Sequence, residues 1–167
     1  MNEIQGLPAH PLLVHGPIVL VPLVALLGIV MVVKRSWRVS LGPWVILLGI
    51  VMFGLTVLAG GAGEALEANV RDTELVHRHA ELGESMRPIA LALLVAIVLL
   101  VAPAWAYARG GRPAMLSRLA TSSAWNIISV VLVIVTAVLA TYWIVVTGHS
   151  GAESVWHNVH LVNPAKD

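Results

Sequence analysis

The chain has 167 residues, of which 58% are hydrophobic and only 11% are charged, whereas a soluble domain carries about 25% charged residues. A water-soluble core of this size cannot hold so many apolar side chains, so lipid must solvate part of the chain. The net charge of +1 argues against nucleic acid as a partner, because phosphate binding needs a concentrated basic surface. Cysteine is absent, which excludes disulfides, thiolate metal sites and covalently attached c-type haem.

Four apolar runs without Asp, Glu, Lys or Arg divide the chain, at about residues 12–33, 40–63, 88–108 and 119–147. Each run reaches or exceeds the ~20 residues that a helix needs to cross ~30 Å of hydrocarbon. The sequence therefore predicts an all-α integral membrane protein, a four-helix bundle that forms a single domain over residues 1–167.

The first run opens with the stretch "LPAHPLLVHGPIVLVP". The first cation, Lys34, follows this run, and no small-residue cleavage site comes after it, so we expect a retained membrane helix and not a cleaved signal peptide. His10 precedes Pro11, which fits a helix start with His10 at or near the cap. His15 lies about one turn further in, where we expect it to reach the bundle interior as a site candidate. The alternative for both histidines is a cap plus an interfacial side chain.

Basic residues mark one side of the membrane. The connections between runs 1 and 2 and between runs 3 and 4 hold six cations and no acid: Lys34, Arg35, Arg38, Arg109, Arg112 and Arg118. Under the positive-inside rule this side is cytoplasmic. The sequence thus predicts a multi-pass protein of the bacterial inner membrane, with both termini and the connection between runs 2 and 3 on the periplasmic side.

All acids and all histidines fall at the predicted periplasmic end. The histidines are His10, His15, His77, His79, His149, His157 and His160. The acids are Glu3, Glu64, Glu67, Asp72, Glu74, Glu81, Glu84, Glu153 and Asp167. Side chains that bind protons or metals are thus confined to one end, and we expect the chemistry of the protein there.

Residues 64–87 are predicted to form an amphipathic segment at this end. Glu74, His77 and Glu81 have i, i+3, i+7 spacing and share one face of a helix. His79 lies on a nearly opposite face, together with Gly83. Two interpretations stay open, namely part of a ligand-binding site or a solvated amphipathic helix that lies on the membrane surface.

The last run leads into a polar tail, residues 149–167. If its helix continues past Gly148, four residues form one stripe at i, i+4, i+8 and i+11: His149, Glu153, His157 and His160. Small residues leave open space beside His149, namely Gly148, Gly151 and Ala152. A planar cofactor or a metal would need such space, and the alternative is a helix that simply emerges into water.

Glycines are also crowded at the end of run 2, where "LAGGAGEA" places Gly60, Gly61 and Gly63 within one turn. Each glycine lowers helix propensity by about 1 kcal/mol. Small residues permit the close approach of another helix or of a ring, and the sequence leaves both explanations open.

The stretch "HPLLVHGPIVLVPL", the pair His79 and Gly83, and the stretch "GHSGAESVW" resemble the bacterial four-helix membrane proteins catalogued as domain-of-unknown-function 2231. The resemblance covers almost the whole chain, and the opening motif is its most specific part. Gly16 stands where an aromatic residue is common in the family, which would enlarge the space beside His15. Gly-Ala-Glu at 151–153 replaces a Gly-Gly stretch, which would add an acid beside the site. The resemblance implies the architecture, carries no assigned activity, and suggests a place near small membrane b-type cytochromes.

The leading functional hypothesis is a membrane haem-b protein, a cytochrome-like electron carrier or redox subunit. We expect His15, His79 and His149, from three helices, to converge at one membrane depth. His15 and His79 are the expected ligand pair, with His149 and His10 as a second pair or as hydrogen-bonding supports. Three arginines are close enough in sequence to pair with the haem propionates: Arg71, Arg78 and Arg87.

Two alternatives stay open. The same end could hold a zinc, iron or copper ion through imidazole and carboxylate ligands, taken from His15, His79, His149, His10, His77, Glu81 and Glu153. The protein could also be a cofactor-free accessory or anchor subunit of a larger membrane complex. Across these hypotheses we expect partner subunits, or for a haem protein a redox partner, on the periplasmic side. A stand-alone enzyme is least favoured, because the chain has no Ser-His-Asp order, phosphate loop or nucleotide fingerprint.

Overall fold

The computed structural model of the protein describes residues 3–4, 6–110 and 113–157. The long helices are α2 (His15–Val33), α4 (Gly42–Glu67), α5 (Glu74–Ala108) and α7 (Ser123–Trp156). The short elements are the strands β1 (Glu3–Ile4) and β2 (Leu7–Pro8), which pair antiparallel, and the helices α1 (Ala9–Leu13), α3 (Trp37–Ser40) and α6 (Ala114–Thr121).

Four helical stretches are long and apolar enough to cross a membrane, which confirms the four predicted spans. They are Ala9–Val33, Gly42–Glu67, Glu74–Ala108 and Ser123–Trp156. The protein is therefore a multi-pass helical membrane protein. The outward faces of these helices carry large exposed apolar side chains that suit contact with the lipid bilayer, among them Leu26, Leu47, Ile50, Val95, Val138 and Val145.

Local chemistry explains where the helices begin and break. The chain passes from α1 to α2 at Val14, because Pro17 has no N–H to donate to the carbonyl of Leu13. Thr73 caps α5 by accepting the N–H of Val76 (3.3 Å). Ser122 caps α7 in the same way, accepting from Trp125 (3.3 Å).

The predicted amphipathic segment 64–87 does not form a helix of its own. α4 runs on to Glu67, a short turn follows, and α5 begins at Glu74 and continues without a break through Pro88. A separate helix lying on the membrane surface, one of the two interpretations of this segment, is therefore wrong. Residues 74–87 are the first turns of a membrane helix: Met86 is buried and His79 half-buried in the bundle, whereas the charged residues Glu74, Arg78, Glu81 and Glu84 are exposed.

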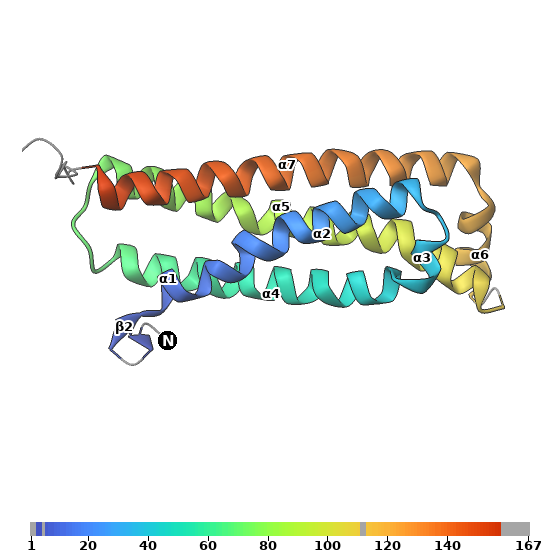
Figure 1. Cartoon of the computed structure of the whole chain (residues 1–167), viewed down its shortest axis with the longest axis horizontal. Coiled ribbons are helices and arrows are strands. Elements are labelled where there is room, and N and C mark those ends of the chain that lie inside the picture. The colour runs from blue at the N-terminus through green and yellow to red at the C-terminus, as the bar shows by residue number, and fades with distance from the viewer. Residues whose placement is uncertain (1–2, 5, 111–112, 158–167) are drawn as a thin grey trace, which may run out of the picture.

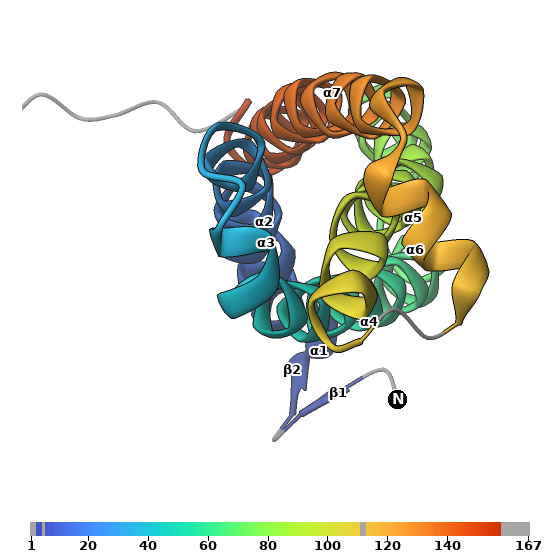
Figure 2. The same ribbon diagram turned by 90° about the vertical axis from the view of Figure 1, so that its right-hand side faces the viewer.

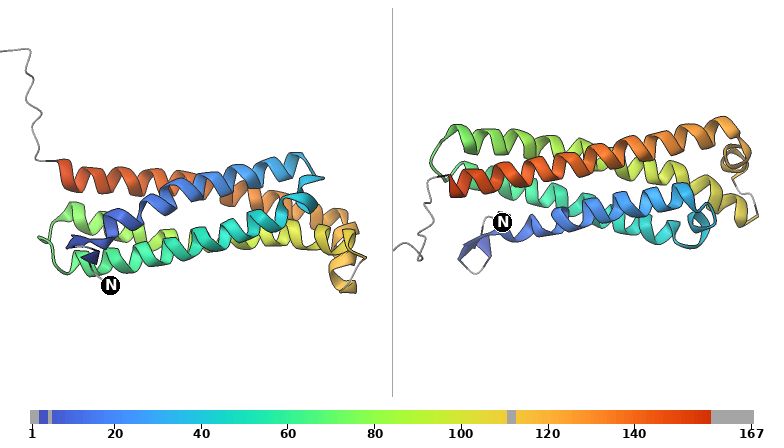
Figure 3. Two further views of the ribbon diagram at one scale, coloured as in Figure 1. Left: turned by 60° about the horizontal axis from the view of Figure 1, so that its bottom comes forward. Right: turned by 45° about the horizontal axis from the view of Figure 1, so that its top comes forward.

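The four long helices form a ring in which each packs against two neighbours, in the order α2, α4, α5, α7 (Figure 2). The β1–β2 hairpin, α1, the α4–α5 turn and the end of α7 lie together at one end of the bundle (Figures 1 and 3). We call this the histidine end (residues 9–15, 59–87 and 147–157). α3 and α6 lie at the other end, which we call the arginine end (residues 34–41, 105–110 and 113–121).

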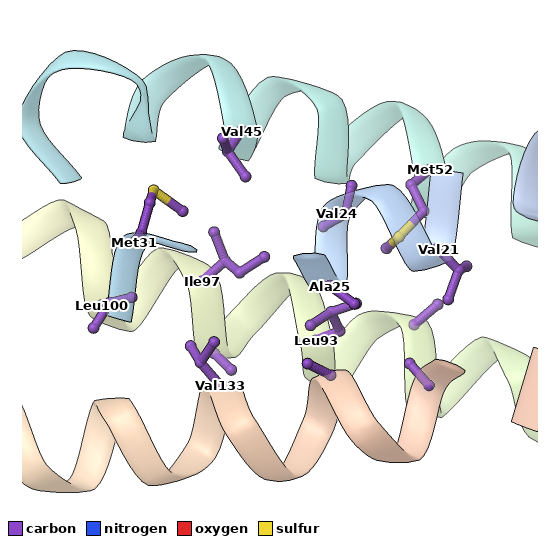
Figure 4. Packing of buried hydrophobic residues seen from close by; sticks show 14 of the residues in the cluster. Val21, Val24, Ala25, Met31, Val45, Met52, Leu93, Ile97, Leu100 and Val133 are labelled. Atoms are coloured by element: carbon purple, nitrogen blue, oxygen red, sulfur yellow. The ribbon is translucent and has the colours of Figure 1, made fainter. Parts of the chain in front are cut away.

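The core is made of small and medium apolar side chains from all four helices (Figure 4). The buried cluster includes Val21 and Val24 from α2, Met52 from α4, Leu93 from α5 and Val133 from α7. Glycines bring the helices close together: a Cβ on residue 28 would lie 3.2 Å from a methyl of Val133, and one on residue 49 would lie 2.9 Å from Leu94. Small residues at helix contacts are typical of membrane bundles, where van der Waals packing holds the helices together.

One buried cation holds the arginine end together. Arg38, on α3, is only 6% exposed. Its Nε donates to the Met31 carbonyl (2.9 Å) and its Nη2 to the Val32 carbonyl (3.4 Å), two of the last carbonyls of α2. Its Nη1 donates to Oδ1 of Asn126 on α7 (2.8 Å). Burial, together with the neighbouring charge of Arg35, lowers the pKa of Arg38 from its ordinary value, and the three acceptors stabilise its positive charge.

We expect Arg38→Ala to lower the free energy of unfolding by roughly 1–3 kcal/mol, because it leaves the Asn126 amide oxygen and the α2 carbonyls without a donor. The matched control is Arg35→Ala, an exposed cation three residues earlier, which should change stability by less than about 0.5 kcal/mol. Reversible unfolding in mixed micelles measures both. Equal effects would show that Arg38 acts only through its charge.

Candidate functional site

His10 lies at the start of α1 and is held by a backbone carbonyl of α4. Its Nδ1 donates to the carbonyl of Ala59 (2.9 Å), because a carbonyl can only accept. Gly63 comes four residues after Ala59, and a Cβ on it would lie 3.1 Å from the imidazole. The glycine N–H is the regular helix donor to the same carbonyl, so the absence of a side chain at Gly63 lets the imidazole reach the second lone pair of that oxygen.

His79, on the first turns of α5, is held in the same way by α7. Its Nδ1 lies 3.1 Å from the carbonyl of Thr147 and 3.1 Å from Oγ of Ser150. The serine hydroxyl donates to the Thr147 carbonyl (2.8 Å), so it accepts from the imidazole. Gly151 comes four residues after Thr147, and a Cβ on it would lie 2.8 Å from Cε1 of His79. Both histidines thus use a helix carbonyl that a glycine leaves open four residues later.

The two imidazoles face each other across the histidine end. The ring centroids of His10 and His79 are 6.0 Å apart, and the ring planes are inclined at 71°. Both rings are half-buried. Because each Nδ1 carries the proton that it donates to a carbonyl, each neutral ring keeps a free lone pair on Nε2. A histidine that binds a metal is oriented by this kind of second-shell hydrogen bond.

Two cavities meet at this imidazole pair. The first, which we call the charged cavity, has a volume of about 470 Å³, within the ~300–1,000 Å³ that is usual for small-molecule sites. Its charged lining residues are Glu64, Glu67, Arg71, Glu84 and Arg87. The second, which we call the apolar cavity, has a volume of about 270 Å³ and is lined mainly by apolar and small residues, including Val14, Pro17, Ile18, Met86, Ile144 and Gly148. Five residues line both: His10, Pro11, Gly60, His79 and Gly83.

Arg87 is the less exposed of the two arginines that line the charged cavity. Its Nη2 donates to Oε1 of Glu64 on α4 (2.5 Å). Its Nε is buried and has no hydrogen-bond partner within the described part of the chain. A Cβ on Gly60 would lie 2.6 Å from that Nε, so the guanidinium lies directly against the α4 backbone. Arg71 also lines the cavity and is exposed.

His15 does not reach the bundle interior, and this expectation is wrong. Its side chain is exposed, and it lines neither cavity. The buried face of α2 begins at Pro17 and continues through Val21, and two residues correspond to about 200° around a helix. Gly16 does not open space beside His15 either, because a Cβ there would lie 2.8 Å from Leu55.

His149 is also exposed and lines neither cavity, so the expected convergence of His15, His79 and His149 is wrong. The buried positions of α7 here are Thr147 and Ser150, and His149 falls between them on another face. α7 does continue past Gly148, but it ends at Trp156, so of the predicted stripe only His149 and Glu153 lie within the helix and His157 is its C-cap. The space beside Gly151, however, is filled by the ring of His79. His160 lies outside the described residues.

The other predicted site residues are divided between the cavity and the surface. Arg71 and Arg87 line the charged cavity, whereas Arg78 is exposed and lines neither cavity. His77 is exposed; its Nδ1 lies 3.4 Å from Glu67 and its Nε2 lies 3.8 Å from Asp72, so it braces the α4–α5 turn.

The carboxylates proposed as metal ligands do not assemble. Glu81 is exposed and Glu153 half-buried, and neither lines a cavity. Among the residues that the structure describes, no group of three or more His, Asp and Glu side chains could hold a metal ion. The seven-residue ligand set expected from the sequence therefore does not come together.

The sequence favoured His15 as the partner of His79 and placed His10 with His149 in a second pair or among the hydrogen-bonding supports, yet the ring of His10 is the one that lies 6.0 Å from that of His79. The acids of the charged cavity were not among the predicted site residues.

The glycines could have indicated where these polar side chains lie. A Cβ on Gly63 would meet His10, one on Gly151 would meet His79, and one on Gly60 would meet Arg87. The two explanations for the glycines of run 2 were the approach of a helix or of a ring; a ring, that of His10, lies at Gly63, whereas the Arg87 guanidinium lies at Gly60 and nothing lies within 4 Å of a Cβ on Gly61.

We expect Gly151→Ala to displace the His79 ring and to weaken its two hydrogen bonds, with a loss of about 1–3 kcal/mol in the free energy of unfolding. Gly148→Ala is the matched control, because a Cβ there meets nothing within 4 Å; it should be neutral or stabilising by up to ~1 kcal/mol. Unfolding in mixed micelles, with the ¹⁵N resonances of His79, measures both. Identical behaviour of the two variants would mean that the ring is not confined.

Comparison with known proteins agrees with this architecture. No curated protein and no solved structure matches the chain. The model of one protein family, described as "Predicted membrane protein (DUF2231)", matches residues 6–163. That range includes all four membrane helices, His10, His79 and both cavities. The chain thus belongs to the DUF2231 family of membrane proteins.

Proposed function

We propose that the protein binds haem b between His10 and His79 and acts as a membrane electron carrier or redox subunit. The observation that carries this proposal is the imidazole pair itself: two half-buried rings from different helices, each held through Nδ1, with no hydrogen bond to either Nε2 from the described residues. Bis-histidine ligation needs only these two protein ligands. A bare metal ion is less favoured, because the described residues offer no third His, Asp or Glu ligand.

The spacing of the pair supports binding of one metal by both rings. Two imidazoles that each bound the haem iron through Nε2, with a metal–nitrogen bond of about 2 Å, would have ring centroids roughly 6 Å apart, and the centroids of His10 and His79 are 6.0 Å apart. The hydrogen bonds to the carbonyls of Ala59 and Thr147 would keep both rings oriented and raise the basicity of Nε2.

The two cavities support the same placement, because a haem has one anionic edge and is otherwise apolar. The charged cavity would receive the propionates, with Arg87 and Arg71 as the cationic groups. The apolar cavity would receive the opposite edge, against side chains such as Ile18, Met86 and Ile144. Both cavities border both imidazoles, so one planar group can occupy them together.

The chemistry of such a site is electron transfer. A haem held by His10 and His79 would supply a one-electron couple. The histidine end would face the periplasm in an N-out, C-out orientation within the inner membrane, because the arginine end carries the cationic connections. The redox partner or partner subunits would then dock on the periplasmic side.

We expect the purified protein, titrated with haem in detergent, to give a low-spin six-coordinate spectrum with a reduced-minus-oxidised b-type band. His10→Ala and His79→Ala should each abolish the low-spin spectrum, because each removes one axial ligand. His15→Ala and His149→Ala are the matched controls, since both side chains are exposed outside the cavities, and both variants should bind haem like the wild type.

Three results would contradict this proposal. The first is a wild-type protein that gives no low-spin species with haem. The second is a spectrum that depends on His15 or His149 and not on His10. The third is stoichiometric zinc, iron or copper without porphyrin, which would favour the metal-ion alternative. A protein that holds neither haem nor metal and co-purifies with larger subunits would favour the accessory role.

A further inference from the structure

Arg87, one of the two cations that line the charged cavity, is already paired with a carboxylate of the chain itself. Glu64 and Arg87 both line this cavity and form an ion pair across α4 and α5. Their side chains are 52% and 32% exposed, so the carboxylate has access to water if the pair opens. The carboxylate therefore sits where a negatively charged group of a ligand in this cavity would be placed.

Arg87 is only partly satisfied by this pair. Its buried Nε has no acceptor in the described part of the chain, while Nη2 is bonded to Glu64. A guanidinium that binds a carboxylate through two parallel N–H groups forms a stronger and more directional contact than one that uses a single N–H. Gly60 holds the guanidinium against the helix backbone, since any side chain there would push it away.

We propose that Glu64 is a built-in competitor for Arg87, which a carboxylate of the bound ligand displaces. This proposal rests on the proposed function, with a haem propionate as the incoming carboxylate. Glu64 then turns toward water, and Arg87 exchanges an internal carboxylate for the one on the ligand. Glu64 would thus set the affinity of the site for porphyrins with free carboxylates and would not affect porphyrins that lack them.

Glu84 offers a matched control on the same cavity. It is an exposed acid that lines the charged cavity, and among the described residues it forms no ion pair with Arg87. Glu64→Gln and Glu84→Gln therefore remove the same charge from the same cavity, and only the first releases Arg87. Any general effect of lowering the negative charge on haem binding appears in both variants.

The test is a spectroscopic titration of the full-length apoprotein with haem and, separately, with haem dimethyl ester. We expect Glu64→Gln to tighten haem binding by about fivefold relative to Glu84→Gln, as suits a partly exposed ion pair. The gain should vanish in an Arg87→Gln background, because the competition requires the guanidinium. With the dimethyl ester, Glu64→Gln and Glu84→Gln should not differ.

Two outcomes would overturn the competition between Glu64 and the ligand while the haem site stands. One is a low-spin spectrum dependent on His10 and His79 with equal affinities for the two glutamine variants. The other is a gain in Glu64→Gln that persists without Arg87 or with the dimethyl ester. No binding of either porphyrin to the wild type would overturn the proposed function and this inference together. Glu64→Ala should behave like Glu64→Gln, and the opposite result would also count against the inference.

Discussion

The histidine end depends on hydrogen bonds between imidazoles and helix carbonyls. An imidazole that leaves water for a helix bundle needs partners for its polar atoms, because an unpaired buried polar group is costly. Helix carbonyls have a spare lone pair, but the side chain four residues later normally covers it. α4 and α7 both solve this with glycine, at Gly63 and Gly151, so that each opens one carbonyl to one histidine. Each glycine lowers helix propensity, but it also makes room for a hydrogen bond that fixes an imidazole.

The hydrogen bonds that hold the two rings also decide which ring nitrogen remains unpaired. The hydrogen bonds of His10 and His79 leave from Nδ1 toward α4 and α7, so Nε2 is the nitrogen left to each ring. The rings form a common boundary of the charged and the apolar cavity. The site thus combines two oriented imidazoles with a gradient from charged to apolar surroundings, and this pattern supports the proposal of an amphiphilic planar cofactor.

The two ends of the bundle handle their cations differently. At the arginine end, each of the three guanidinium nitrogens of the buried Arg38 donates to an acceptor, namely an α2 carbonyl or the Asn126 amide oxygen. At the histidine end, the buried Nε of Arg87 has no acceptor in the described part of the chain, and its Nη2 is paired with the half-exposed carboxylate of Glu64. The first arrangement stabilises the fold, whereas an unpaired donor beside a cavity is the kind of group that a ligand would satisfy.

The sequence by itself determined four membrane helices, the confinement of histidines and acids to one end, and the family, because charge and apolar length decide which segments lipid can accept. It did not determine which histidines meet. Lipid-facing helices such as α2 are apolar nearly all round, so their sequence does not mark the buried face. Only tertiary packing sets the rotation of each helix. The break at Val14 and the glycine contacts turned His10 toward His79 and left His15 and His149 outside.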